Sequence, residues 1–133
     1  MEMPVPDATV LARKSRVVER LQQVLPKDAV IHDERETRAY ECDALTAYKC
    51  PPMAAVLPTT TKEVSAVLRI CHEEGVPVVP RGAGTSLAGG ALPTADCVIL
   101  GVAKMNDVIE TNYSDRYIRC LLYTSPSPRD QRP

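Results

Sequence analysis

The sequence "VLPTTTKEVSAVLRICHEEGVPVVPRGAGTSLAGGALP", residues 56–93, contains the pattern that decides the fold. An apolar run of strand length, residues 53–58, leads into it, and a second apolar run occupies residues 76–80. Between the two runs, Thr60 and Glu63 have the spacing of a helix capping box, and Gly75 stands where a helix favours a left-handed residue. A strand, a helix and a strand within about 30 residues predict a βαβ unit whose two strands are parallel.

Most of the glycine in the chain follows the second predicted strand. Four of the six glycines lie in residues 82–90, next to Arg81 and the hydroxyls of Thr85 and Ser86. Glycine permits positive φ and close approach to the backbone, and successive N–H groups in such a loop can form an anion-binding nest. Arginine adds a permanent charge and a planar fork that suits phosphate. The pattern therefore predicts a phosphate or pyrophosphate cradle, with a glycine-rich turn that binds nothing as the alternative.

Two common phosphate-binding motifs do not fit this loop. Gly84 and Gly89 have the glycine spacing of a Walker A loop, but Gly90 and Ala91 occupy its lysine and hydroxyl positions. A Rossmann fingerprint would need a third glycine where Leu87 stands. The loop is therefore of a different type.

Outside this region the elements are predicted from periodicity. Residues 9–26 have helical spacing of apolar side chains and indicate one amphipathic helix. Residues 28–33 indicate a short strand, and residues 97–101 a third strand after the loop. Residues 107–112 and 117–120 indicate a hairpin joined at "NYSD".

The composition excludes several classes of protein. The 133 residues carry a net charge of -1 and lack Phe and Trp, so neither a nucleic acid nor an anionic membrane is expected as a partner. No apolar run approaches the length of a membrane span, and the N-terminus lacks the apolar segment of a signal peptide. Five cysteines without C-x-x-C spacing indicate reduced thiols, most of them in the core, and a cytoplasmic location.

The last fourteen residues differ from the rest of the chain. "CLLYTSPSPRDQRP", residues 120–133, has three prolines and no periodicity. It resembles the conceptual translation of a sequencing adapter, so native sequence is expected to end near Arg119; a Pro-rich disordered terminus is the alternative. The expected divisions are an N-terminal helical extension in residues 1–50, a truncated cofactor-binding domain in residues 51–119 and a non-native tail in residues 120–133.

At the glycine loop the chain resembles a known family, the FAD-binding domain of the vanillyl-alcohol oxidase and p-cresol methylhydroxylase (PCMH) type. The resemblance covers roughly residues 30–119 and rests on "PTTTKEV" and "VPVVPRGAGTS". Within the family, "YECDALTAYKCPPMAAVLP" is most similar to the flavin subunits that oxidise glycolate, with D-lactate dehydrogenases close behind. The implied fold class is α+β: the first half of such a domain, with a βαβ core after an N-terminal helical segment, and incomplete.

The resemblance also implies a site. The residues that would wrap the FAD pyrophosphate are Arg81, Gly82, Ala83, Gly84, Thr85 and Ser86, with Gly89 and Gly90 closing the loop. Pro58 would end the first strand near the adenosine side of FAD. Some relatives carry a histidine, covalently bonded to the flavin, where Thr85 stands here, so FAD is expected to be non-covalent.

No catalytic residue and no metal ligand is expected in this chain. His32 and His72 lie in polar segments without an orienting partner, and Cys42 and Cys50 are too widely spaced for a zinc knuckle. The expected function is that of the N-terminal fragment of an FAD-dependent 2-hydroxy-acid oxidoreductase acting on glycolate or D-lactate. The resemblance implies partner subunits, among them an iron–sulfur protein, through which the protein would reach a membrane. The alternatives are a stand-alone FAD- or nucleotide-binding module and an inactive fragment.

Overall fold

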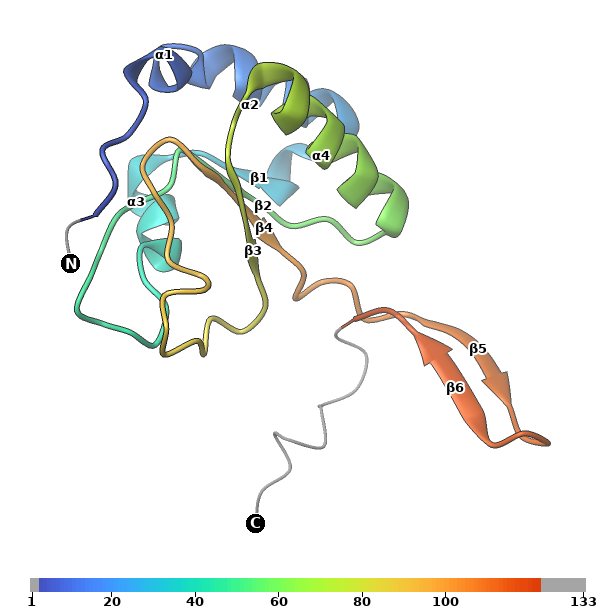
Figure 1. Ribbon diagram of the computed structural model, residues 1–133. Helices are drawn as coiled ribbons and strands as arrows, with labels where there is room; N and C mark the ends of the chain where they lie inside the picture. The colour runs from blue at the N-terminus through green and yellow to red at the C-terminus, as the bar shows by residue number, and fades with distance from the viewer. Residues whose placement is uncertain (1–2, 123–133) are drawn as a thin grey trace.

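Four short strands form one mixed sheet in the computed structural model, which describes residues 3–122. The strands are β1 (Val30–Ile31), β2 (Ala54–Val56), β3 (Val78–Arg81) and β4 (Val98–Gly101). Their spatial order is β1-β2-β4-β3. Strand β1 is antiparallel to β2, whereas β2 and β3 both run parallel to β4 (Figure 1).

The predicted βαβ unit is present, but its two strands are not neighbours. Strands β2 and β3 are parallel, as predicted, and β4 lies between them, with Ile99 opposite both Ala55 and Val79. All four residues of β4 are buried, whereas β3 is only partly buried and contains Pro80. Because proline has no N–H to donate to a second neighbour, it favours an edge strand, which is the position that β3 occupies.

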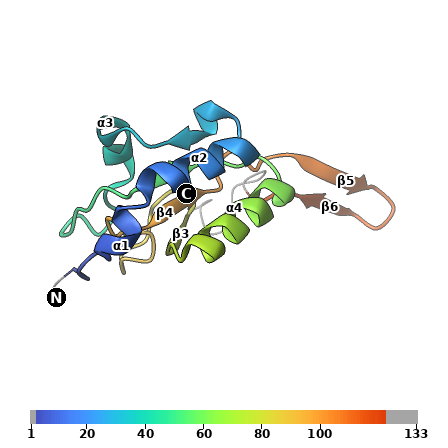
Figure 2. The same ribbon diagram turned by 90° about the horizontal axis from the view of Figure 1, so that it is seen from above.

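Helices α2 (Lys14–Val24) and α4 (Thr61–Glu74) lie side by side over one face of the sheet (Figures 1 and 2). The predicted capping box is formed: the Thr60 hydroxyl accepts from the Glu63 N–H at 3.2 Å, and the Glu63 carboxylate accepts from the Thr60 N–H at 3.2 Å. Gly75 ends α4 with φ 63°, in the left-handed region. The side chains that the two helices bury are Val17, Val18, Leu21, Val67, Ile70, Cys71 and Glu74.

The N-terminal helix differs from the prediction of one continuous element. It is divided into α1 (Ala8–Leu11) and α2, with the break at residues 12–13. The Arg13 N–H bonds to the Val10 carbonyl three residues back at 3.0 Å, and Arg13 leaves the helical region with ψ 7°. Asp7 caps α1 by accepting from the Thr9 N–H. The helical hydrogen-bond pattern is therefore interrupted at Arg13, and α2 begins there as a separate helix.

A buried carboxylate ties α2 to the end of α4. The Glu74 side chain is 2% exposed, and its Oε1 lies 3.1 Å from Arg16 Nε and 2.7 Å from Arg20 Nη1. Arg20 also pairs with Glu73. The hydrogen bond from Arg20 and the charges of the two guanidinium groups lower the pKa of Glu74, although burial opposes this. The ion pairs thus hold the two helices together at the rim of the core.

The segment between β1 and β2 forms short helical turns. They are α3 (Glu34–Thr37) and η2 (Arg38–Tyr40), and a further turn, η1 (Lys27–Ala29), precedes β1. Asp33 caps α3 by accepting from the Arg35 N–H at 2.8 Å. These turns bring residues 40–45 beside the sheet.

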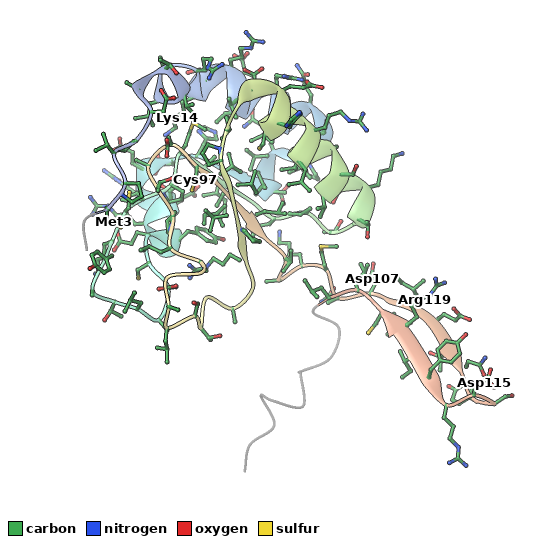
Figure 3. All side chains as sticks on the ribbon, viewed as in Figure 1. Met3, Lys14, Cys97, Asp107, Asp115 and Arg119 are labelled. Atoms are coloured by element: carbon green, nitrogen blue, oxygen red, sulfur yellow. The ribbon has the colours of Figure 1, made fainter. Side chains whose placement is uncertain are left out.

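The hairpin β5 (Val108–Asn112) and β6 (Tyr117–Cys120) forms as predicted and projects away from the sheet (Figure 1). Figure 3 labels Asp107, Asp115 and Arg119 along it. The pairing reaches the first residues of the segment assigned to the tail: Cys120, which the hairpin prediction also includes, pairs with Val108, and the Leu121 N–H bonds to the Asp107 carbonyl at 2.8 Å. Residues 123–133 of that segment lie outside the described part of the chain.

The cysteines are all free, but fewer are in the core than expected. Cys71 and Cys97 are buried, whereas Cys42, Cys50 and Cys120 are partly exposed. No helix within residues 3–122 is long and apolar enough to cross a membrane.

Candidate functional site

The glycine loop begins where β3 ends, at the edge of the sheet where the three parallel strands have their carboxyl ends. It runs from residue 82 to the start of β4 and lies below the sheet in Figure 1. Ligands of open α/β sheets bind at this edge because the loops that follow the strands leave backbone groups free there. The loop is therefore placed as a binding site would be.

Two of the four loop glycines have backbone conformations that favour glycine. Gly84 has φ 72° and Gly89 has φ 77°, whereas Gly82 and Gly90 are not in the positive-φ region. An added Cβ at Gly84 would lie 2.6 Å from the Arg81 Cζ atom, so the space beside Gly84 is already filled. Gly84 thus allows a turn that passes directly over the Arg81 side chain.

The backbone after this turn offers hydrogen-bond donors. Within residues 3–122, the N–H groups of Gly84, Thr85 and Ser86 have no intramolecular acceptor. The Ser86 hydroxyl accepts from the Ala88 N–H at 3.3 Å and from the Gly90 N–H at 3.0 Å. Ser86 therefore holds the second half of the loop in shape. Consecutive donors beside a left-handed glycine are a feature of the backbone nests that bind anions.

The Arg81 side chain points toward another segment of the chain. Its Nη1 donates to the Cys42 carbonyl at 2.7 Å, and its guanidinium carbon lies 5.7 Å from the centre of the Tyr40 ring. Sequence analysis expected this fork to face a phosphate. The observed contacts instead join the start of the loop to residues 40–42.

A buried carboxylate that sequence analysis missed connects the same segment to the far end of the loop. Asp43 is 4% exposed, and it accepts from the Leu45 N–H at 2.9 Å and from the Ala91 N–H at 3.4 Å. Residues 40–50 have no regular periodicity, so no element is assigned to them from the sequence. The only signal in the sequence is an aspartate within a mixed polar and apolar stretch that precedes β2.

Pro58, the other residue assigned to the cofactor, follows β2 and is fully buried. Its strand ends at the same sheet edge as β3, because both strands run parallel to β4. The loop residues and Pro58 therefore share one edge of the sheet.

An apolar cavity of about 400 Å³ opens between the glycine loop and residues 45–48, and its volume is within the range of small-molecule pockets. Its lining consists of Met3, Pro4, Leu45, Tyr48, Ala88, Gly89, Leu92 and Thr94. Planar and apolar groups fit such a lining. The cavity and the free N–H groups lie on the two halves of one loop.

Other candidate groups are not brought together. His32 is exposed, with its Nε2 3.4 Å from the Gln22 amide nitrogen, and His72 is exposed on α4. Within the described residues, no group of three or more His, Cys, Asp or Glu side chains is placed to hold a metal ion. The described part of the chain thus contains a candidate binding loop without an assembled acid–base pair.

The model of one protein family, described as an FAD binding domain, matches residues 52–120, just over half of the chain. The chain belongs to this family of FAD-binding domains. The match begins just before β2 and ends at the last residue of β6, so it contains the whole glycine loop.

Relatives and solved structures agree with this assignment. The chain is 40% identical over 106 residues to glycolate oxidase subunit GlcD of Escherichia coli, covering 80% of this chain and 21% of the relative. It is 34% identical over 94 residues to D-lactate dehydrogenase of Anaerostipes hadrus, covering 70% of this chain and 20% of the relative. The chain therefore spans about a fifth of the length of these curated relatives.

The fold is similar to that of p-cresol methylhydroxylase, with a TM-score of 0.68 and 26% identity over 81% of this chain and 22% of the other. A 4-ethylphenol oxidase from Gulosibacter chungangensis has the same fold, with a TM-score of 0.68 and 24% identity over 84% of this chain and 22% of the other. These matches confirm the resemblance to the PCMH type and the predicted α+β class, here with a mixed sheet, and they cover part of a larger fold.

Proposed function

We propose that this chain is the N-terminal part of an FAD-dependent 2-hydroxy-acid oxidoreductase and that it holds the pyrophosphate of FAD in the glycine loop. The observation that carries the proposal is the set of free N–H groups on Gly84, Thr85 and Ser86 at the carboxyl edge of the parallel strands. The family assignment supports FAD as the ligand, and the similarity to a glycolate oxidase subunit and a D-lactate dehydrogenase supports the substrate class.

The residues present fit a pyrophosphate. Gly84 has a positive φ, which occurs in anion-binding nests, and a Cβ at this residue would be obstructed by the Arg81 side chain. The proposed cradle consists of Gly82, Ala83, Gly84, Thr85 and Ser86, closed by Gly89 and Gly90, with Arg81 at the start of the loop and Pro58 near the adenosine side. When bound, FAD supplies an acceptor for the hydride of a 2-hydroxy acid. This chain's own contribution is to bind and orient the anion and to exclude water along the apolar cavity.

FAD is proposed to bind non-covalently, because Thr85 occupies the position at which some relatives have a histidine. The threonine hydroxyl cannot replace the imidazole that bonds to the flavin in those relatives. Acid precipitation of the flavin-loaded protein tests this. All yellow flavin is expected in the supernatant, and flavin retained in the pellet would contradict the proposal.

The proposed substrate is glycolate or D-lactate. The proposed partners are other subunits of the same enzyme, among them an iron–sulfur protein. The proposed location is the cytoplasm. The similarity to a protein named as a subunit of glycolate oxidase supports partner subunits.

Residues 120–133 are proposed to be adapter-derived. Resequencing the source gene across the codon for Arg119 tests this, since an authentic stop codon after Pro133 would refute it.

Titration of the 133-residue chain with FAD, ADP and riboflavin tests the cradle. FAD and ADP both carry a pyrophosphate and are expected to bind, whereas riboflavin has none and is expected to bind more weakly. Ser65→Ala, on the exposed side of α4, is the matched control and should bind as the parent chain does. Equal binding of riboflavin and FAD, or no binding of FAD or ADP by a folded chain, would refute the proposal.

A second candidate is a nucleotide-binding module without catalysis. The observation that favours it is that the described residues contain no assembled acid–base pair. Flavin reduction by glycolate or D-lactate in the protein encoded by the resequenced gene would decide against this candidate.

A further inference from the structure

We infer that Arg81 is a positioning residue: it holds the glycine loop against residues 40–42 and thereby sets the shape of the loop, without contacting phosphate. The inference has two parts, each with its own test. The ligand arm, which concerns the effect of Arg81 on FAD binding, rests on the proposed function. The positioning arm, which concerns the shape of the loop, does not, because the contacts that define it lie within the chain. We use the name Arg81 clasp for Arg81, Tyr40 and Cys42.

The first step is the direction of the Arg81 side chain. The hydrogen bond from Nη1 to the Cys42 carbonyl, at 2.7 Å, joins residues 39 positions apart in sequence. The guanidinium also lies over the Tyr40 ring, with 5.7 Å between its carbon and the ring centre. A charged donor to a carbonyl and a cation–π contact are each stronger than an exposed contact between neutral groups. The side chain is therefore fixed by a segment outside the loop.

The second step is the fit between Arg81 and Gly84. A Cβ at Gly84 would lie 2.6 Å from Arg81 Cζ and 3.1 Å from Arg81 Nε. The guanidinium thus occupies the volume that a side chain at residue 84 would fill. Because the loop turns over this group with φ 72° at Gly84, the position of the guanidinium determines where the turn lies.

The far end of the glycine loop is attached to residues 40–45 as well. The buried Asp43 carboxylate accepts from the Ala91 N–H at 3.4 Å, across 48 positions in sequence. Residues 40–45 therefore hold the loop at both ends, and the free N–H groups of residues 84–86 lie between the two attachments. Loss of the Arg81 clasp should loosen the half of the loop that carries these donors.

Hydrogen–deuterium exchange of the FAD-free chain tests the positioning arm. In Arg81→Gln and Tyr40→Leu, the hydrogen-bonded amides of Ala88, Gly90, Ala91 and Leu45 are expected to exchange about tenfold faster, since opening no longer breaks the contacts of a charged group. Amides of α4 should be unchanged, and Arg69→Gln, an exposed arginine on α4, should behave as the parent chain. Loop exchange in both variants equal to that of the parent chain would overturn the inference.

The ligand arm compares Arg81→Lys with Arg81→Gln. Lysine keeps the charge but not the planar fork, so the inference expects both variants to raise the FAD Kd by a similar factor, about tenfold. The dependence of Kd on salt should also stay that of the parent chain, because no phosphate contact is lost. A near-normal Kd for Arg81→Lys, or a weaker salt dependence for Arg81→Gln, would show that Arg81 contacts phosphate directly and would overturn the inference.

The two arms separate this inference from the proposed function. If the parent chain binds no FAD while the clasp variants show faster loop exchange, the proposed function fails and the positioning role stands. If FAD binds normally to the clasp variants and loop exchange is unchanged, the positioning role fails and the proposed function stands.

Discussion

An added methyl group at Gly84 should lower the stability of the chain for two separate reasons, backbone strain and overlap with Arg81. Alanine at φ 72° costs about 1–2 kcal/mol in backbone strain. Its Cβ would also lie 2.6 Å from Arg81 Cζ, so the guanidinium would have to move. Moving it breaks the hydrogen bond to the Cys42 carbonyl, worth about 1.5–3 kcal/mol, and the Tyr40 contact, worth about 0.5–1 kcal/mol. Together these contributions predict a loss of about 3–6 kcal/mol for Gly84→Ala.

Gly75 provides a matched control for the backbone contribution. Its φ is 63°, and an added Cβ there would have no heavy atom within 4 Å. Gly75→Ala should therefore cost only the strain of the left-handed conformation, about 1–2 kcal/mol. Urea unfolding at pH 7, followed by circular dichroism, gives both free energies of unfolding. A Gly84→Ala cost no larger than that of Gly75→Ala would refute the packing argument.

The same comparison in an Arg81→Ala background isolates the overlap. With the guanidinium removed, Gly84→Ala should cost about as much as Gly75→Ala, because only the backbone strain is left. A cost that stays at its full value in this background would show that another group obstructs residue 84.

Three further measurements test the rest of the fold. Thr60→Ala removes the cap of α4 and should lower the free energy of unfolding by about 1 kcal/mol in urea titrations; no loss would contradict the capping box. The hydrogen bond from Arg20 lowers the pKa of Glu74 in the folded chain. The ionised carboxylate therefore stabilises the fold at pH values above its unfolded pKa, and this stabilisation is lost as the pH falls through the folded pKa. Glu74→Gln should therefore unfold with less acid sensitivity than the parent chain, and equal sensitivity would be contrary to this. Burial raises the pKa of Cys71 and of Cys97 to about 11, so at neutral pH both should react with a thiol reagent only after unfolding, and equally fast labelling in the native chain would show that they are accessible.

The elements predicted correctly from the sequence are those stabilised by neighbouring residues. The cap of α4 involves residues three apart, and its end requires only one left-handed residue, Gly75. The turn of the hairpin is similarly local: the Asp115 N–H bonds to the Asn112 side chain at 2.9 Å. Local hydrogen bonds leave a local pattern, and such patterns can be read without knowing the rest of the chain.

The strand order was predicted only in part. The sequence pattern predicted that β2 and β3 are parallel, but it did not predict that β4 lies between them. Two local signals, the fully apolar β4 and the proline in β3, agree with the observed order, yet neither specifies which strands pair. Pairing depends on how the whole apolar surface is buried, which is a property of the assembled sheet.

The sequence by itself determined where the loop lies, which residues it contains, and that its glycines and hydroxyls suit an anion. Only the tertiary structure decided what Arg81 and Asp43 do. Their partners, the Cys42 carbonyl and the Ala91 N–H, are backbone groups 39 and 48 positions away. Every residue except proline has such an N–H and every residue has such a carbonyl, so the identity of these partners leaves no trace in the amino-acid sequence. Their proximity arises from packing residues 40–45 against the sheet edge, and that packing fixes the direction of the Arg81 side chain.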